Sequence, residues 1–471
     1  MPTEKTLGEL FERTAVYALA FREALPERLQ RPEASYREMQ KIFDEPTPET
    51  GLPATIVIDD LVARAKRGLS AMAGPRFFGW VLGASHPVGV AADWLTSAWG
   101  QNAGGHTPTP AAAAVEEAAA RWLLDILDLP RESSVGFVTG ATIANFVCLA
   151  AARSEVLRRL GWDVEADGLF GAPAIQVLIG EDAHTSVFSA LQFLGLGGNR
   201  VTRVATDEQG RMKTPAFAEA AKAAHSPLIA IAQAGQINTG AFDPLSEIAE
   251  VAHEHGAWLH VDGAFGLWAR ACPQHAHLAR GIERADSWAT DGHKWLQTPH
   301  DCGYAIVRDQ AIHRRAMTIT ASYLPPLGEG ERNPSHFVPE LSRRARGFAT
   351  WAMIRALGRS GIAEMVARHC RIARRMAERL AREPGVSVMN EVELNQAAVR
   401  FGAKEPIERG DELTAKIIER VQAEGICYVA GARWQGRWIM RLSVISWPTA
   451  EADADRSVEA ILSAWRAVRA E

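Results

Sequence analysis

The sequence predicts an α/β protein built around a mainly parallel sheet that is covered by helices on both faces. Short, largely apolar runs recur through the middle of the chain, and helical patterns separate one run from the next. Strands that are buried on both faces have this near-continuous apolar character, and alternation of strands with helices is typical of parallel sheets. The predicted strands are residues 135–138, 175–179, 201–204, 228–232, 258–261 and 303–307.

The first region, residues 1–80, predicts an N-terminal helical arm. Helical patterns alternate there with breaks rich in proline and threonine, such as residues 45–51. Such an arm lacks a core of its own, so we expect it to pack on something else. Residues 81–345 form the predicted large domain, which contains a helix over residues 115–127 that ends before Pro130.

The last region, residues 346–471, predicts a small α+β domain. Long helices come first, and strand patterns and further helices follow them. This order favours an antiparallel sheet that flanks the functional site. The elements expected after the long helices are a strand at 395–401, a helix at 413–424, a strand at 438–444 and a closing helix from Ala450.

Composition sets limits on function. The chain has 471 residues, of which 47% are hydrophobic and 23% are charged, and its formal net charge is -5. These values are ordinary for a globular protein and offer no electrostatic attraction to nucleic acid or acidic membranes. The five cysteines are scattered without metal-ligand spacing, and no apolar run approaches the length of a membrane span. We therefore expect a cytoplasmic protein with reduced thiols and no metal, nucleic-acid or membrane partner.

A lone lysine stands beside a histidine after an apolar run, in Asp286-Ser-Trp-Ala-Thr-Asp-Gly-His-Lys294. Lys294 is one of eight lysines and the only one between Lys222 and Lys404. Upstream, His260-Val-Asp262 ends another apolar run with a carboxylate, the group that keeps a pyridinium nitrogen protonated. The pair predicts a pyridoxal phosphate enzyme in which Lys294 binds the cofactor. The alternative is a buried strand end whose lysine reaches out to water.

Two more strand ends carry candidate ligands for such a cofactor. In Thr139-Gly-Ala-Thr142, small residues lead from a strand into a helix, whose free amides can bind a phosphate. His184 follows another strand, where an imidazole can stack on a flat ring. The alternatives are close packing for the helix start and a capping or core role for His184. Their order along the chain favours a site, because parallel sheets bind ligands at the carboxyl ends of strands.

These motifs together resemble those of the group II pyridoxal-phosphate amino acid decarboxylases, which include aromatic amino acid, tyrosine, histidine and glutamate decarboxylases. The resemblance runs from about residue 75 to residue 449 and covers most of the chain. Its motifs are specific for the family but far less specific for the substrate. They are Thr139-Gly-Ala-Thr-Ile-Ala-Asn145, Asp182-Ala-His184, Asn238-Thr-Gly-Ala-Phe-Asp-Pro244, His260-Val-Asp-Gly-Ala264 and Asp291-Gly-His-Lys-Trp295.

The resemblance implies a role for each matching position. Lys294 would hold the cofactor as an internal aldimine, and loss of carbon dioxide would lead to a quinonoid intermediate. Asp262 would pair with the ring nitrogen, while His184 and Ala264 would lie against the two faces of the ring. The residues implied to hold the phosphate are Ala141, Thr142 and His293.

The resemblance also implies an architecture. The fold would be fold type I of the pyridoxal phosphate enzymes, with a seven-stranded sheet in the large domain. The protein would be a homodimer with its active sites at the subunit interface. The N-terminal arm would then pack across the partner subunit, which agrees with its lack of a core.

Tyr323 matches the tyrosine that returns a proton to Cα in the family. It precedes a stretch rich in glycine, proline and glutamate at residues 325–334, which we expect to form a flexible lid. The alternative for Tyr323 is an ordinary interface aromatic. Related enzymes with phenylalanine at this place form aldehydes oxidatively, so the tyrosine favours plain decarboxylation.

Several positions depart from the family pattern. Gln236 and Ile237 stand where many members have two threonines near the cofactor, and Asp291 stands where some have an asparagine near the phosphate. A carboxylate beside a phosphate is unfavourable unless it turns to the backbone or to a histidine. His300 stands where aromatic amino acid decarboxylases have a bulky apolar residue. A hydroxylated, indolic or acidic substrate would explain it, and so would a histidine at a surface loop.

The substrate side chain is only weakly indicated. The family places part of its side-chain pocket at residues 80–82, which are apolar here and favour an aromatic or otherwise hydrophobic amino acid. An acidic substrate would need a cation, for which Arg343, Arg344 and Arg346 are candidates unless they are structural.

The sequence therefore predicts a decarboxylase that converts an L-amino acid, preferably aromatic, to its amine and carbon dioxide. Alternatives with the same cofactor are an acidic amino acid decarboxylase and a lyase or aldehyde synthase. A protein of another class would carry pyridoxal phosphate without turnover. The presence of Lys294, Asp262, His184 and Tyr323 together argues against a carrier.

Overall fold

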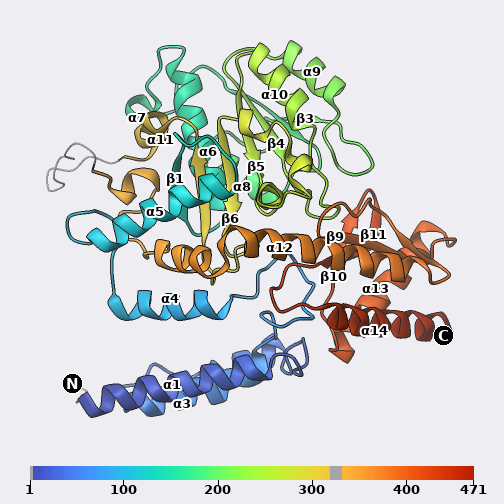
Figure 1. Cartoon of the computed structure of the whole chain (residues 1–471). Helices are drawn as coiled ribbons and strands as arrows, with labels where there is room; N and C mark the ends of the chain where they lie inside the picture. The colour runs from blue at the N-terminus through green and yellow to red at the C-terminus, as the bar shows by residue number, and fades with distance from the viewer. Residues whose placement is uncertain (1–3, 319–330, 471) are drawn as a thin grey trace.

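The computed structural model describes residues 4–318 and 331–470 and contains two β-sheets. The larger sheet has seven strands and the smaller has four, and the two lie side by side (Figure 1). The predicted strands coincide with strands of the larger sheet to within one residue at each end. The larger sheet consists of β1 (Ser134–Val138), β2 (Gln176–Gly180), β3 (Thr202–Val204), β4 (Leu228–Gln233), β5 (Trp258–Asp262), β6 (Ser287–Asp291) and β7 (Gly303–Val307).

Six of the seven strands run in one direction, and β7 is the exception. The order across the sheet is β1-β7-β6-β5-β4-β2-β3. Strand β7 is antiparallel to both of its neighbours, so that Val307 pairs with Ser134 of β1 and with Ser287 of β6. The other neighbouring pairs are parallel. The prediction of a mainly parallel, seven-stranded sheet is confirmed, and the six co-directional strands bring their carboxyl ends to one edge.

Alternate strand residues face two different helical layers. In β2, Val177 and Ile179 pack in one core cluster, whereas Leu178 packs in the cluster on the opposite face. Burial on both faces explains why the strands are apolar throughout. The first cluster lies under α6 (Ala141–Arg158), α8 (Thr185–Phe193) and α11 (Gln310–Met317), and the second lies under α5 (Pro110–Ile126), α9 (Thr214–Ala223) and α10 (Leu245–Glu254). Helix α5 begins before the predicted residue 115 because Pro110 suits the first turn of a helix.

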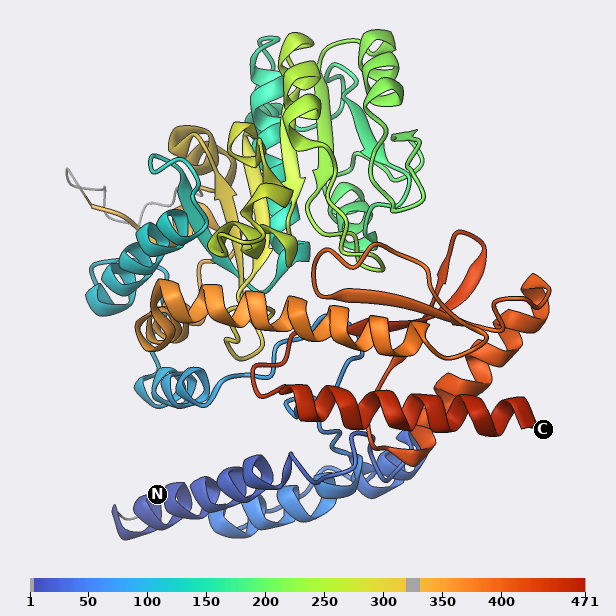
Figure 2. The ribbon, with the colours of Figure 1, turned by 45° about the vertical axis from the view of Figure 1, so that its right-hand side comes forward.

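The smaller sheet is antiparallel, as the pattern of its sequence predicts. Its order is β10-β11-β9-β8. Helix α12 (Gly347–Ala381) runs from the larger sheet to the smaller one and is broken at Gly358, whose φ is 62° (Figure 2). The remaining elements of this part are β8 (Val386–Val388), β9 (Gln396–Phe401), α13 (Ile407–Glu424), β10 (Ala430–Trp434), β11 (Arg437–Ser443) and α14 (Glu451–Ala470).

The N-terminal helices lie apart from both sheets. Helices α1 (Glu4–Ala24) and α3 (Ala54–Ala65) lie side by side, joined by an ion pair of 2.6 Å between Arg13 and Asp59 (Figure 1). Phe11, Val16 and Leu19 on α1 are 58–65% exposed, although they are apolar. In the described part of the chain no helix is long and apolar enough to span a membrane. The other helices of this region are α2 (Tyr36–Phe43) and α4 (Pro87–Trp99), and the short α7 (Val164–Asp167) follows α6.

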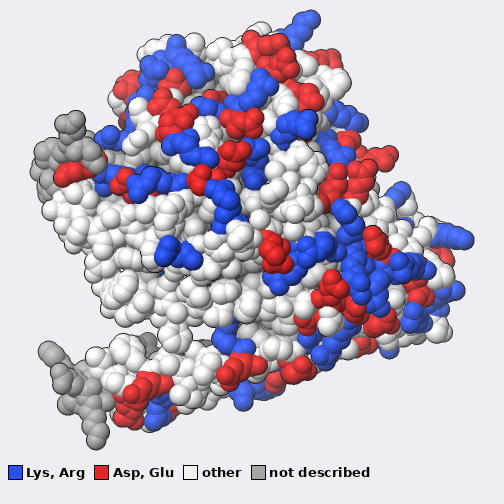
Figure 3. Space-filling model, viewed as in Figure 1, with Lys and Arg blue, Asp and Glu red and all other residues white. Residues whose placement is uncertain are grey.

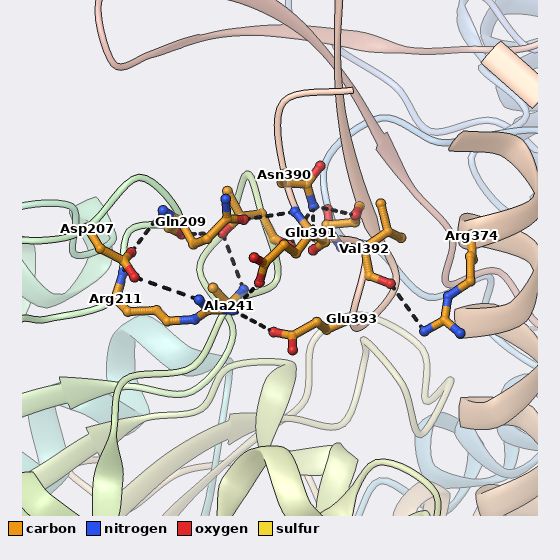
Figure 4. A network of polar contacts seen from close by, with 11 residues as sticks. Asp207, Gln209, Arg211, Ala241, Arg374, Asn390, Glu391, Val392 and Glu393 are labelled. Carbon is orange, nitrogen blue, oxygen red and sulfur yellow. Dashed lines mark hydrogen bonds and ion pairs between the residues drawn. The ribbon is translucent and has the colours of Figure 1, made fainter. Parts of the chain in front are cut away.

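A polar network joins the loops of the two sheets (Figure 4). Arg211, after β3, lies 2.9 Å from Glu391 and 2.8 Å from Glu393, which precede β9. Nδ2 of Asn390 donates a hydrogen bond of 2.9 Å to the carbonyl oxygen of Thr239. This network ties the loop after β4 to the smaller sheet.

Candidate active site

One cavity lies at the carboxyl edge of the larger sheet, with a volume of about 340 Å³. Residues at or just after the ends of β1, β2, β4, β5 and β6 line it, as expected for a sheet whose strands share one direction. The structure therefore brings together residues from five separate parts of the chain. The predicted site residues on its wall are Ala141, Thr142, His184, Asp262, Ala264, His293 and Lys294.

Lys294 and the start of α6 share one carboxylate, that of Asp291. Nζ of Lys294 lies 2.9 Å from Oδ2 of Asp291, and the backbone N–H of Ala141 donates a hydrogen bond of 2.6 Å to Oδ1. Asp291 is only 2% exposed. Its side chain thus takes the position at a helix N-terminus that favours an anion. The carboxylate of Asp291 therefore turns to the backbone, which is one of the two arrangements expected for an acid near a bound phosphate.

His293 lies between Asp291 and His300. Its Nε2 is 3.6 Å from Oδ1 of Asp291, and its Nδ1 accepts a hydrogen bond of 3.3 Å from the backbone N–H of Cys302. The rings of His293 and His300 have their centroids 4.3 Å apart. Burial lowers the pKa of His293 and lowers the pKa of His300 to about 4, so both rings are neutral at pH 7.

Asp262 is a buried carboxylate whose two oxygens are both held. The N–H of Ala264 donates to Oδ1 at 3.1 Å, and Nδ2 of Asn145 donates to Oδ2 at 3.3 Å. Burial raises the pKa of Asp262, and the nearby His184 and Lys294 partly oppose this shift. A further cation next to Asp262 would therefore stabilise the charged form of its carboxylate.

His184 caps helix α8. Its Nδ1 accepts a hydrogen bond of 3.2 Å from the backbone N–H of Ser186 and lies 2.8 Å from Oγ of the same serine. Burial lowers its pKa, so the ring is neutral at pH 7 and carries its hydrogen on Nε2. His184 therefore caps helix α8 and also lines the cavity, so the two roles do not exclude each other.

The turn that carries Lys294 is supported from behind by Gly83. The N–H of Gly83 donates to the carbonyl oxygen of His293 at 2.9 Å. A Cβ atom at Gly83 would lie 2.3 Å from the carbonyl oxygen of Lys294, so only glycine fits at this approach. The same segment carries Trp80, which is 51% exposed and belongs to an aromatic group with Phe77 and Tyr428.

The remaining candidate positions differ in where they lie relative to the cavity wall. Ile237 lines the cavity, whereas the side chain of Gln236 turns to the carbonyl oxygen of Asp182 and to the N–H of Asn238. His300 is not part of the cavity wall, but its ring packs against His293, which is. Tyr323 lies outside the described residues.

The three arginines considered for an acidic substrate have carboxylate partners. Arg343 pairs with Glu116 at 2.8 Å, and both side chains are buried. The other two pairs, Arg344 with Asp93 and Arg346 with Asp301, have distances of 2.7 Å and 3.1 Å. These contacts agree with a structural role.

Two residues near the site carry no obvious signal in the sequence. Asn145 lies on the sheet-facing side of α6 and contacts Asp262. Arg441, on β11, is 8% exposed, its Nε and Nη2 atoms have no hydrogen-bond partner among the described residues, and burial lowers its pKa to about 10. Arg441 is one of the charges that act on His184. The sequence does not mark Asn145 as a neighbour of Asp262 or Arg441 as a buried charge near His184, because only the tertiary structure brings these groups together.

Comparisons with known proteins agree with this arrangement. The family described as "Pyridoxal-dependent decarboxylase conserved domain" matches residues 36–404. The aromatic-L-amino-acid decarboxylase of Bacillus atrophaeus is 27% identical over 85% of this chain and 83% of its own length. The acidic amino acid decarboxylase GADL1 of Bos taurus is 29% identical over 81% of this chain and 76% of its own length.

Among solved structures, the crystal structure of Oryza sativa TDC with PLP and tryptamine has the same fold. Its TM-score is 0.92 at 22% identity, and the match covers 99% of this chain and 98% of that one. The fold, the cavity and the sequence match lead to one conclusion. The chain belongs to the pyridoxal-dependent decarboxylases, amino acid carboxy-lyases that use pyridoxal 5'-phosphate.

Proposed function

We propose that the cavity binds pyridoxal 5'-phosphate through Lys294 and decarboxylates an L-amino acid with an aromatic side chain. The observation that carries this proposal is the convergence of Lys294, Asp262 and His184 with the N-terminus of α6 on one cavity. Each of these has a partner group on the cofactor. Lys294 would bind the aldehyde, Asp262 the ring nitrogen, His184 the face of the ring and the start of α6 the phosphate.

The described residues fit this cofactor. Asp262 is buried, and a protonated ring nitrogen would supply the cation that its charged form needs. At the other end of the cavity, Gly140 leaves room before α6, since a Cβ atom there would lie 3.1 Å from Cε1 of His293. The backbone amides at the start of α6, with Thr142 and His293, would hold the phosphate.

Each residue then has a defined task. Lys294 supplies the amine that attaches the cofactor, and Asp262 keeps a proton on the ring nitrogen. His184 and Ala264 hold the flat ring between them, which His184 does as a neutral imidazole. When bound, the cofactor takes up the electron pair that carbon dioxide leaves on Cα. The sequence alone supports the last task, the return of a proton to Cα by Tyr323.

The preference for an aromatic substrate rests on two features. Trp80 and Phe77 form an aromatic group with Tyr428. The segment that carries Trp80 and Phe77 continues to Gly83, which contacts the turn of Lys294. Arg343, Arg344 and Arg346 already have carboxylate partners and so do not offer a free cation. An acidic substrate remains the second candidate, and Arg441 is the observation that favours it.

We also propose a homodimer. Trp94, Leu95 and Trp99 on α4 are 46–50% exposed, and a broad face over α4 and α5 carries few charged residues (Figure 3). Exposed apolar side chains gathered on a face with few charges are typical of a protein interface. Light scattering after gel filtration should give twice the mass of one chain, and a mass of one chain would contradict the homodimer.

Two measurements test the proposed reaction. Borohydride reduction of the cofactor-loaded protein followed by peptide mapping should label Lys294, and a label on another lysine would refute the assignment. A panel of L-amino acids should then give carbon dioxide and the amine, fastest with aromatic substrates. Aldehyde with peroxide as main products would overturn the task given to Tyr323. A cofactor spectrum that no amino acid changes would indicate a carrier.

A further inference from the structure

A continuous chain of polar side chains lies in the core behind Asp262. Asn145, on α6, is the member that touches Asp262. Behind it, Nε2 of His260 lies 2.9 Å from Oδ1 of Asn145, and Nδ1 of His260 lies 2.9 Å from Oγ of Ser287. Nε1 of Trp258 donates to the same Oγ at 3.0 Å. The side chains of Asn145, His260 and Ser287 have no exposed surface.

The chemistry of these groups fixes the direction of every hydrogen bond in the chain. The carboxylate of Asp262 only accepts, so the NH₂ group of Asn145 faces it and Oδ1 of Asn145 faces Nε2 of His260. Burial lowers the pKa of His260 to about 3, so its neutral ring carries the hydrogen on Nε2 and donates to Oδ1 of Asn145. Nδ1 of His260 is then left without a hydrogen and accepts from the O–H of Ser287, which itself accepts from the indole N–H of Trp258.

The orientation of the Asn145 amide is therefore set from both sides. A flipped amide would place its oxygen against Oδ2 of Asp262 and its NH₂ group against the N–H of His260, which are two repulsive contacts. Nδ2 also lies 3.5 Å from Oγ of Ser186, the serine that contacts Nδ1 of His184. The Asn145 amide thus contacts Asp262 directly and is linked to His184 through Ser186.

The two contacts on Asp262 lock its carboxylate plane. Ala264 holds one oxygen from the strand end, and Asn145 holds the other from α6. A carboxylate held by only one donor could rotate about its Cβ–Cγ bond. In a buried network of this kind a broken link leaves polar groups unsatisfied and is costly.

We propose that Asn145 and His260 are positioning residues for the decarboxylation: His260 fixes the Asn145 amide, and Asn145 aims Asp262 at the cofactor's ring nitrogen. The inference rests on the proposed function, since it takes Asp262 as the partner of that nitrogen. Neither residue touches the cavity, because neither contributes to its wall.

The first test uses the cofactor-free protein and does not depend on the proposed function. Nitrogen-15 NMR of labelled histidine should find His260 as a single Nε2–H tautomer in the wild type, assigned by its loss in His260→Gln. Asn145→Leu removes the acceptor and should change this signal. An Nδ1–H tautomer in the wild type would reverse the chain of hydrogen bonds and refute the inference.

The second test compares His260→Leu, which removes the donor, with His260→Gln, whose amide can still donate to Asn145. With cofactor bound, His260→Leu and Asn145→Leu should lower kcat about tenfold with little change in KM, because binding contacts stay in place. The pH midpoint of the visible cofactor band should shift in the same two variants. His260→Gln should stay close to the wild type in both measurements.

Controls separate positioning from folding and from failure of the proposed function. Melting curves and borohydride labelling at Lys294 check that each variant folds and binds the cofactor. If Asn145→Leu does not fold, the two His260 variants decide the question. Equal behaviour of His260→Gln and His260→Leu would refute the inference, as would wild-type kcat and pH midpoint in His260→Leu. Failure of Lys294 labelling in the wild type would instead refute the proposed function.

Discussion

The Nζ atom of Lys294 lies 2.9 Å from Oδ2 of Asp291, whose other oxygen accepts the N–H of Ala141 at the start of α6. The sequence predicts that a phosphate binds at this same helix start. A buried carboxylate and the phosphate would therefore be neighbours, and Lys294 is a cation in direct contact with that carboxylate.

Asp291→Asn should strengthen the binding of pyridoxal phosphate relative to pyridoxal. The asparagine keeps an oxygen that can accept from Ala141 but removes a negative charge near the phosphate. We expect the ratio of the two dissociation constants to change by about threefold or more in favour of the phosphate form. Absorbance titration of each aldehyde measures it. An unchanged ratio would mean that Asp291 does not oppose the phosphate.

Gly83→Ala should weaken cofactor binding although Gly83 carries no functional side chain. The added Cβ would lie 2.3 Å from the carbonyl oxygen of Lys294 and 2.6 Å from that of His293, so the turn between them must move. Gly51→Ala is the matched control, because a Cβ there meets nothing within 4 Å. Fluorescence titration with pyridoxal phosphate should give a higher dissociation constant for the first variant alone.

Glu116→Gln should destabilise the protein strongly. It would leave the Arg343 guanidinium without its carboxylate at a place where the side chains are 0% and 1% exposed. Removing one partner of a buried pair costs about 3–5 kcal/mol. Urea unfolding measures the change, and Glu117→Gln is the control, since the exposed Glu117–Arg121 pair should add nothing measurable. Equal stability of the two variants would contradict the structural role of Arg343.

His313 should make the protein sensitive to acid. Its ring contacts Ser134 and the carbonyl oxygen of Phe337, and burial lowers its pKa to about 3. The unfolded state takes up a proton near pH 6.5, so stability is full above that pH and falls as the pH drops toward 3.

The expected slope from this one residue is about 1.4 kcal/mol per pH unit between those limits. Urea unfolding at pH 7, 6 and 5, at one protein concentration, should give a shallower pH dependence for His313→Gln than for the wild type. The exposed His225→Gln serves as the control. Parallel curves for His313→Gln and the wild type would refute the assignment.

The strands and the cavity residues could be predicted because their signals are local. A buried parallel strand is a short apolar run, and the residue after it lies at the sheet edge whichever strands are its neighbours. This holds for His184, Asp262 and Lys294, which all line the cavity. The reversed direction of β7 has no such signal, because direction depends on how the chain returns to the sheet.

The partners of individual side chains could not be read from the sequence. Arg343 lies far along the chain from Glu116, and Asn145 lies far from His260, so that only the packing of α5 and α6 on the sheet brings each pair together. The sequence marks Asp291 as a departure from the family pattern, but its hydrogen bond from Ala141 depends on the packing of β1 and β6 on either side of β7. Charge pairs across such distances are properties of the tertiary structure.

The position of β7 between β1 and β6 has a consequence for biosynthesis. The strands that precede the helix start and the Lys294 turn, β1 and β6, pair with opposite sides of residues 303–307. A ribosome-bound chain that stops before residue 303 contains both halves of the pocket but lacks the strand between them, so we expect it to capture vitamin B6 only after this strand has emerged.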